Sequence, residues 1–229
     1  MAEEWRHGTT GRRTSAARER FDRIYHTLRD RICLLDYPPG TRLSEEALAE
    51  EFGISRTPLR RVLGWLESQG LLKSVQGVGT IVTDVDLDEL TQVYQLRMEL
   101  AELLGKLSPV MPDAETLALF RALHKRSLAL IGQPDPRSFA RLNMDFLQAL
   151  LLITGNEPLR EISERLYFQT TRIWLKLTAH MDIAEEVSVF SREIHDILAA
   201  VEIGDLEAAG YIRRSHISMS FTRLKKLAI

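Results

Sequence analysis

The stretch that decides the fold covers residues 38–72 and reads PPGTRLSEEALAEEFGISRTPLRRVLGWLESQGLL. Ser44 precedes two glutamates and a set of apolar residues at helical spacing, which predicts a short helix that ends at Gly53. Ser55 is suited to begin a second helix almost directly afterwards, and Gly70 is suited to end it. Two helices joined by so short a connection are typical of a helix-turn-helix.

A helix before this stretch and a hairpin after it extend the pattern. From Phe21 to Leu35 the apolar residues recur at steps of three and four, which predicts an amphipathic helix. β-Prone runs over residues 71–75 and 80–83 flank the glycines of Gln76-Gly77-Val78-Gly79, which predicts a hairpin. This order of elements indicates a winged helix-turn-helix, a fold that binds DNA.

The second helix of the motif carries arginines on the face opposite its apolar stripe. Its predicted inward residues are Leu59, Val62, Leu63 and Leu66. A rotation of about 100° per residue leaves Arg56, Thr57 and Arg60 facing outward near the helix N-terminus. Arginines there can bind guanine edges or hold phosphates. The alternative is an ordinary solvated helix face.

After the hairpin the strand signals end, and the remaining sequence is helical. Helices are predicted near residues 86–107, 113–131, 136–153, 157–179, 184–203 and 205–226, separated by prolines and glycines. We therefore predict a mainly α protein with three parts: a disordered arm over 1–15, a winged helix-turn-helix of three helices and a β-hairpin over 16–83, and an all-α six-helix bundle over 84–229.

Composition and missing motifs narrow the class of protein. The chain is 45% hydrophobic, has a net charge of -2 and contains a single cysteine, Cys33, so no disulfide framework is expected. We expect a cytoplasmic protein with no membrane partner, because the sequence shows neither a signal peptide nor a long apolar run. The motifs of serine hydrolases, nucleotide-binding loops and zinc proteases are missing, so we expect no enzyme activity.

Residues 38–72 and the following wing resemble the GntR family of bacterial regulators. The matching positions are Pro39-Gly40, Arg42-Leu43-Ser44-Glu45, Leu48-Ala49, Gly53, Ser55-Arg56-Thr57-Pro58, Arg60, Leu63, Leu66-Glu67, Gly70-Leu71 and Gly77. We therefore expect DNA contacts from Arg42, Ser55, Arg56, Thr57, Arg60, Arg61, Gln76 and Gly77. This sequence departs from the family at Glu46, where arginine is frequent, and at Arg61, where alanine is frequent.

The helical part resembles the FCD ligand-binding domain of the FadR-type subgroup. The resemblance is carried by Tyr94, Arg97, Glu99, Phe146, Gly155-Asn156, Pro158-Leu159, Gly204-Asp205 and His216. Many such domains hold a divalent metal through an Asp-x-x-x-His pair and two more histidines. Three of these four positions here hold Asn143, Leu147 and Ile194, so we expect no metal or other cofactor. A metal-dependent sensor rebuilt by His195 and His216 remains the alternative.

A ligand pocket is expected among Tyr94, Arg97, Asn143, Leu147, Trp174, Ile194 and His216. His216 is predicted to share an inward stripe with Ala209, Ile212 and Met219, either as a satisfied core histidine or as a donor to ligand. An arginine in an apolar cavity is costly unless paired. Arg97 therefore implies either an internal carboxylate such as Glu99 or a bound anion, with a metabolite carboxylate as the natural candidate.

Together these features predict a homodimeric transcription regulator that binds a palindromic operator. We expect a repressor that a small-molecule effector relieves. The main alternative is a ligand-independent DNA-binding protein whose helical domain is closed and serves only for dimerisation.

Overall fold

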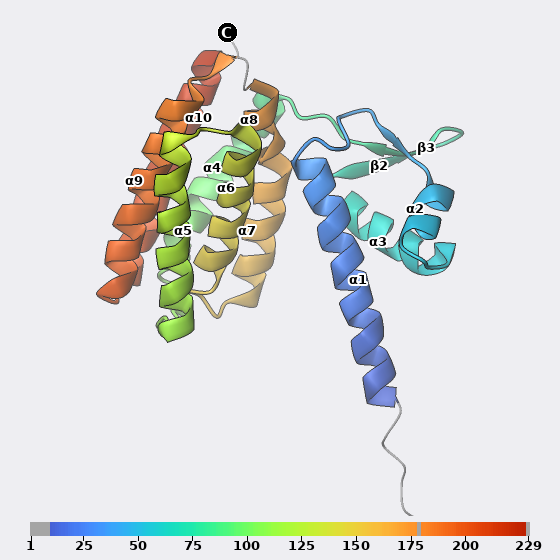
Figure 1. Cartoon of the computed structure of the whole chain (residues 1–229), viewed down its shortest axis with the longest axis horizontal. Coiled ribbons are helices and arrows are strands. Elements are labelled where there is room, and N and C mark those ends of the chain that lie inside the picture. The colour runs from blue at the N-terminus through green and yellow to red at the C-terminus, as the bar shows by residue number, and fades with distance from the viewer. Residues whose placement is uncertain (1–9, 178–179, 228–229) are drawn as a thin grey trace, which may run out of the picture. The chain divides into compact units, whose positions relative to one another are not determined.

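The computed structural model describes residues 10–177 and 180–227 (Figure 1). The chain divides into two compact units, the first ending at Asp84 and the second beginning at Val85. The boundary placed between residues 83 and 84 by the sequence differs from this division by a single residue. No helix in the described ranges is long and apolar enough to cross a bilayer.

The first unit contains helices α1 (Thr10–Cys33), α2 (Glu45–Glu51) and α3 (Arg56–Ser68). The prediction of an arm up to residue 15 is wrong for its last part, because α1 is already helical from Thr10. The sequence has no proline in this segment to stop the helix. Residues 1–9 of the predicted arm lie outside the described residues.

The core of the first unit confirms the predicted inward faces. On α1 the buried residues include Ile24, Leu28 and Ile32. On α3 they are Leu59, Val62, Leu63 and Leu66, the predicted stripe. Ser44 caps α2, because its hydroxyl accepts a hydrogen bond from the Ala47 N–H at 3.2 Å.

The predicted hairpin is present, but it belongs to a three-stranded sheet. The strands β1 (Arg42–Leu43), β2 (Leu72–Val75) and β3 (Gly79–Val82) are antiparallel and lie in the order β1-β3-β2. In β1, Arg42 pairs with Ile81 and Leu43 with Thr80. The sequence analysis missed β1 because two residues are too few to show an alternating pattern.

The second unit is all helical, and its described part contains seven helices rather than the predicted six. They are α4 (Leu87–Leu103), α5 (Ala114–Gly132), α6 (Pro136–Leu151), α7 (Glu157–Thr170), α8 (Arg172–Leu177), α9 (Ile183–Glu202) and α10 (Leu206–Leu227). The helix predicted over 157–179 divides at Thr171. Just before it, the Thr170 hydroxyl donates back to the Tyr167 carbonyl oxygen at 2.9 Å, a bond that bends helices.

Turn residues and aromatic packing fix the bundle. Asp113, Asp135, Asn156 and Asp182 each accept an N–H from the first turn of the helix that follows. Inside, the ring of Phe146 meets those of Phe120 and Phe190 edge to face, with centroids 6.2 and 5.4 Å apart. In Figure 1 the long helices of this unit run alongside one another.

Candidate functional sites

The residues predicted to contact DNA are all exposed on the first unit. Four of them, Arg56, Thr57, Arg60 and Arg61, lie in the first turns of α3, and Ser55 directly precedes it. The Ser55 hydroxyl makes no capping hydrogen bond to α3, so it is available to an external partner. Arg42 lies on β1, while Gln76 and Gly77 form the tip between β2 and β3.

Two arginines of this face are held by glutamates at the start of α2. The Arg60 Nε lies 2.7 Å from Glu45 Oε2, and the Arg56 Nη2 lies 3.4 Å from Glu46 Oε1. Exposed ion pairs of this kind contribute about 1 kcal/mol or less. The two ion pairs therefore orient both guanidinium groups, and little free energy is needed to separate either arginine from its glutamate. The sequence analysis noted Glu46 only as a departure from the family, and it did not predict either pair.

Glycines shape the wing and let Arg42 lie over it. Gly77 and Gly79 have φ angles of +76° and +110°, which a side chain would strain. A Cβ atom on Gly79 would lie 3.5 Å from the Arg42 Nε, so the glycine leaves room for this arginine across the sheet. The wing thus adds a positive charge beside its tip.

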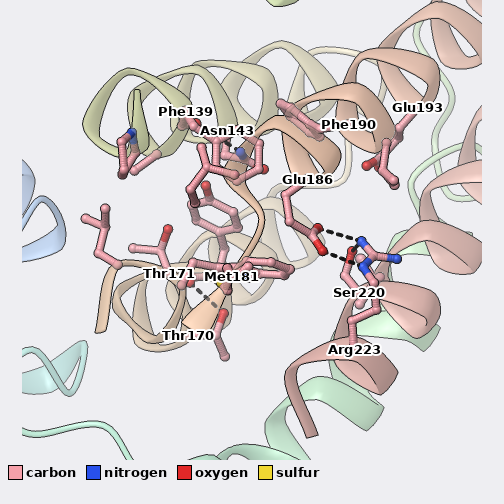
Figure 2. Close-up of a pocket in the computed structure, with 18 of the residues that line it drawn as sticks. Phe139, Asn143, Thr170, Thr171, Met181, Glu186, Phe190, Glu193, Ser220 and Arg223 are labelled. Atoms are coloured by element: carbon pink, nitrogen blue, oxygen red, sulfur yellow. Dashed lines mark hydrogen bonds and ion pairs between the residues drawn. The ribbon is translucent and has the colours of Figure 1, made fainter. Parts of the chain in front are cut away.

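The second unit contains a cavity that opens to solvent among residues of α4 and α6 to α10 and whose volume, mouth included, is about 790 Å³ (Figure 2). Four of the predicted pocket residues line it: Tyr94, Arg97, Asn143 and Trp174. Leu147 instead lines a neighbouring cavity of about 300 Å³, which shares Arg97 and Tyr167 with the first. Ile194 is fully buried and lines neither of these cavities.

His216 also lines neither cavity, because the inward face of α10 differs from the predicted one. The buried residues of α10 are Leu206, Ala209, Gly210, Arg213, Ile217, Phe221 and Leu224. Met219, expected inside, is 47% exposed. The helix turns Arg213 inward, and an apolar pattern cannot anticipate a buried charge.

The environment of His216 favours its neutral form. Its Nδ1 lies 3.8 Å from Glu193 Oε2. Burial lowers the pKa of His216, and the nearby negative charge of Glu193 opposes that shift only in part. Within the described residues the buried Nδ1 of His216 accepts no hydrogen bond and donates none, so His216 is not the satisfied core histidine of the first alternative. It also lines neither cavity, so its predicted role as a donor to ligand stays a prediction.

Two ion pairs that the sequence analysis missed form part of the cavity wall. Arg223 binds Glu186 through two hydrogen bonds of 2.7 and 2.8 Å, visible in Figure 2, and Arg213 binds Glu193 at 2.5 Å. Both glutamates are more than nine-tenths buried. Their spacing along α9 could have revealed them, because residues seven apart lie on the same helix face.

Arg97 differs from these paired arginines. Its Nη1 donates to the Thr170 hydroxyl at 2.6 Å, and its guanidinium carbon lies 5.1 and 5.2 Å from the ring centres of Tyr94 and Tyr167. Glu99, the predicted internal partner, is exposed and pairs with Arg214 instead. No carboxylate in the described ranges forms an ion pair with Arg97. Burial, reinforced by the charge of Arg213, lowers the pKa of Arg97.

The remaining metal-ligand positions are separated. Asn143 donates to the Phe139 carbonyl oxygen in its own helix at 2.9 Å. His195 is exposed and lies beside His124 of α5, with ring centres 5.2 Å apart. Among the residues that the structure describes, no group of three or more His, Cys, Asp or Glu side chains is placed to hold a metal ion.

Comparisons with known proteins match both units. Residues 21–82 match the model of the bacterial regulatory proteins of the gntR family, and residues 92–219 match that of the FCD domain. The uncharacterised HTH-type transcriptional regulator YdhC of Bacillus subtilis is 28% identical over 182 residues, which cover 74% of this chain and 81% of YdhC.

Two further proteins match nearly the whole chain. The Uxu operon transcriptional regulator of Escherichia coli is 25% identical over 228 residues, covering 92% of this chain and 88% of its own length. The solved structure of E. coli McbR/YncC is similar with a TM-score of 0.78 at 21% identity, covering 92% of this chain and 99% of that one. This last likeness shows a common fold.

Proposed function

Because this chain belongs to the GntR family of bacterial regulatory proteins and has an FCD domain, it is a transcription regulator, and we propose that it is a repressor released by a carboxylate-bearing metabolite. Its relatives are transcription regulators rather than enzymes. The proposal has three parts: the repressor role, the class of effector, and the residues that contact DNA.

The DNA-binding part of the proposal uses the exposed start of α3. Arg56, Thr57 and Arg60 enter the major groove, where an arginine fork binds the O6 and N7 atoms of guanine. Ser55, Arg42 and Arg61 contact phosphates, and the tip at Gln76 and Gly77 contacts the backbone or the minor groove. The exposure of all these side chains supports the assignment.

The protein acts as a homodimer in this proposal. Two recognition helices related by a two-fold axis meet successive major grooves, so the operator is a palindrome. Effector binding in the second unit changes the population of the dimer conformation that fits this spacing.

The observation that carries the effector part is Arg97. It is a half-buried cation in the cavity wall, with neutral hydrogen-bonding and aromatic neighbours and no carboxylate partner in the described ranges. A charge withdrawn in part from water in this way is costly unless an anion joins it. The rival, a closed and ligand-independent bundle, fits poorly with a cavity that opens to solvent among residues of α4 and α6 to α10.

Native mass spectrometry of the protein purified without chelator tests the proposal. We expect a dimer, part of which retains a small organic acid that is lost when Arg97→Gln is purified in the same way. A monomer, or a dimer that no organic acid binds or stabilises against heat, would contradict it.

A further inference from the structure

The wall of the cavity in the second unit carries one more positive than negative side chain. Arginines 97, 213 and 223 and glutamates 186 and 193 are the charged residues in its wall. Both glutamates are engaged by an arginine, through the Glu186–Arg223 and Glu193–Arg213 pairs. One positive charge, that of Arg97, is therefore left for a ligand to neutralise.

The neighbours of Arg97 cannot neutralise it. Thr170 accepts one of its hydrogen bonds but carries no charge. Burial raises the pKa of Tyr94, so its hydroxyl stays protonated and neutral at ordinary pH. The guanidinium group has more N–H donors than these contacts use, arranged as a fork that fits the two oxygens of a carboxylate.

A second negative charge on the ligand would have no cation to meet. A second negative charge that approached Arg213 or Arg223 would meet a guanidinium group already paired with a buried glutamate. It would lie beside the negative charge of Glu193 or Glu186, and displacing that glutamate would leave its carboxylate buried without a partner, which is strongly unfavourable. The charge arrangement thus favours a monoanion over a dicarboxylate or a phosphate ester.

The rest of the cavity wall selects the body of the ligand. The rings of Phe139, Trp174 and Phe190 line it, and Phe139 meets the other two edge to face with centroids 6.4 and 5.6 Å apart. Figure 2 shows Phe139 and Phe190 on two neighbouring helices, α6 and α9. Such rings pack well against a flat apolar group.

From these observations we propose that the effector is an aromatic or similarly apolar monocarboxylate, with its carboxylate bound to Arg97 and its ring among Phe139, Trp174 and Phe190. This inference rests on the proposed function and narrows the ligand class.

Calorimetric titration of the full-length protein with benzoate, phenylacetate, benzamide and succinate tests the inference. We expect at least one of the two aromatic acids to bind at least tenfold more tightly than benzamide, which has the ring without the charge, and than succinate, which has a second carboxylate. Arg97→Gln should weaken that binding at least tenfold. Arg160→Gln, which changes an exposed arginine paired with Glu157 on α7, should leave the affinity unchanged.

A second variant keeps the test meaningful if Arg97→Gln unfolds. Thr170→Val keeps the shape of a fully buried side chain. It removes the acceptor that orients Arg97, together with the hydroxyl's hydrogen bond to the Tyr167 carbonyl oxygen, so it should weaken binding several-fold. Arg97-dependent binding of succinate in preference to both aromatic acids would overturn this inference and leave the proposed function intact. No binding by any of these acids would overturn the inference, and the absence of stabilisation by any organic acid would overturn the proposed function as well.

Discussion

Arginine–glutamate pairs occur in both units, but in opposite surroundings. In the first unit the Arg60 and Arg56 side chains are 65% and 56% exposed where they meet Glu45 and Glu46. In the second unit the Arg213 and Glu193 side chains are 7% and 4% exposed. The exposed pairs are accessible to solvent, whereas the buried pair is part of the cavity wall. In our proposal the exposed arginines can give up their glutamates for DNA, and the buried arginine stays paired.

Breaking the buried pair should have the largest effect. Glu193→Ala leaves Arg213 buried without its counter-ion, and we expect the free energy of unfolding to fall by about 3–5 kcal/mol. Glu45→Ala, which breaks the exposed pair with Arg60, should change it by about 1 kcal/mol or less. Urea denaturation measures both. If both variants lost the same free energy of unfolding, the buried and exposed ion pairs would not differ in the way that we describe.

Removing an exposed arginine should affect DNA binding instead of folding. Arg56→Ala is expected to lose about 1–3 kcal/mol of binding free energy on DNA selected from a random pool, with unchanged thermal unfolding. The loss should be smaller on unselected sequences, because base contacts carry the specificity. Fluorescence anisotropy on both kinds of DNA decides this, and an equal loss on all sequences would show that Arg56 contacts only phosphates.

The two units also differ in how closely their helical glycines are packed. On α3 of the first unit, no atom lies within 4 Å of the place that a Cβ would take on Gly64. Gly64→Ala should therefore stabilise the protein by up to about 1 kcal/mol through helix propensity. On α10 a Cβ at Gly210 would approach the Glu102 carbonyl oxygen to 2.8 Å, so Gly210→Ala should destabilise it by about 1–3 kcal/mol. Calorimetric melting compares the two, and a stabilising Gly210→Ala would contradict the close packing.

The smallest effect is expected at Glu46. Glu46→Gln removes a carboxylate 3.4 Å from Arg56 and should raise the affinity for unselected DNA a few-fold, because one phosphate-repelling charge is lost. Glu50→Gln, on the same helix but outside these ion pairs, is the matched control. A fall in affinity specific to Glu46→Gln would instead indicate that Glu46 contacts a base.

The two units also differ in how much of them the sequence predicted. In the first unit, capping residues, glycines and a regular apolar stripe agree with one another, so the exposed face of α3 followed directly from Leu59, Val62, Leu63 and Leu66. The pairing of β1 escaped prediction because it depends on contacts distant in sequence.

In the second unit the fold class was predictable and the site was only partly so. Tyr94, Arg97, Asn143 and Trp174, which were expected in a pocket, line the cavity. An apolar pattern could not place Arg213, Arg223, Glu186 and Glu193 there. Charged residues are expected outside, and burial of these four depends on their pairing across α9 and α10. For the same reason the sequence analysis placed His216 on the inward face of α10, where the structure has Arg213.

The affinity of the full-length protein for its selected DNA, measured by anisotropy with and without a bound monocarboxylate, tests the central claim most directly. In the wild-type protein the acid should weaken DNA binding, and in Arg97→Gln it should have no effect, while DNA binding without the acid remains unchanged. An acid effect of equal size in both proteins, or no effect in the wild type under saturating acid, would contradict the account.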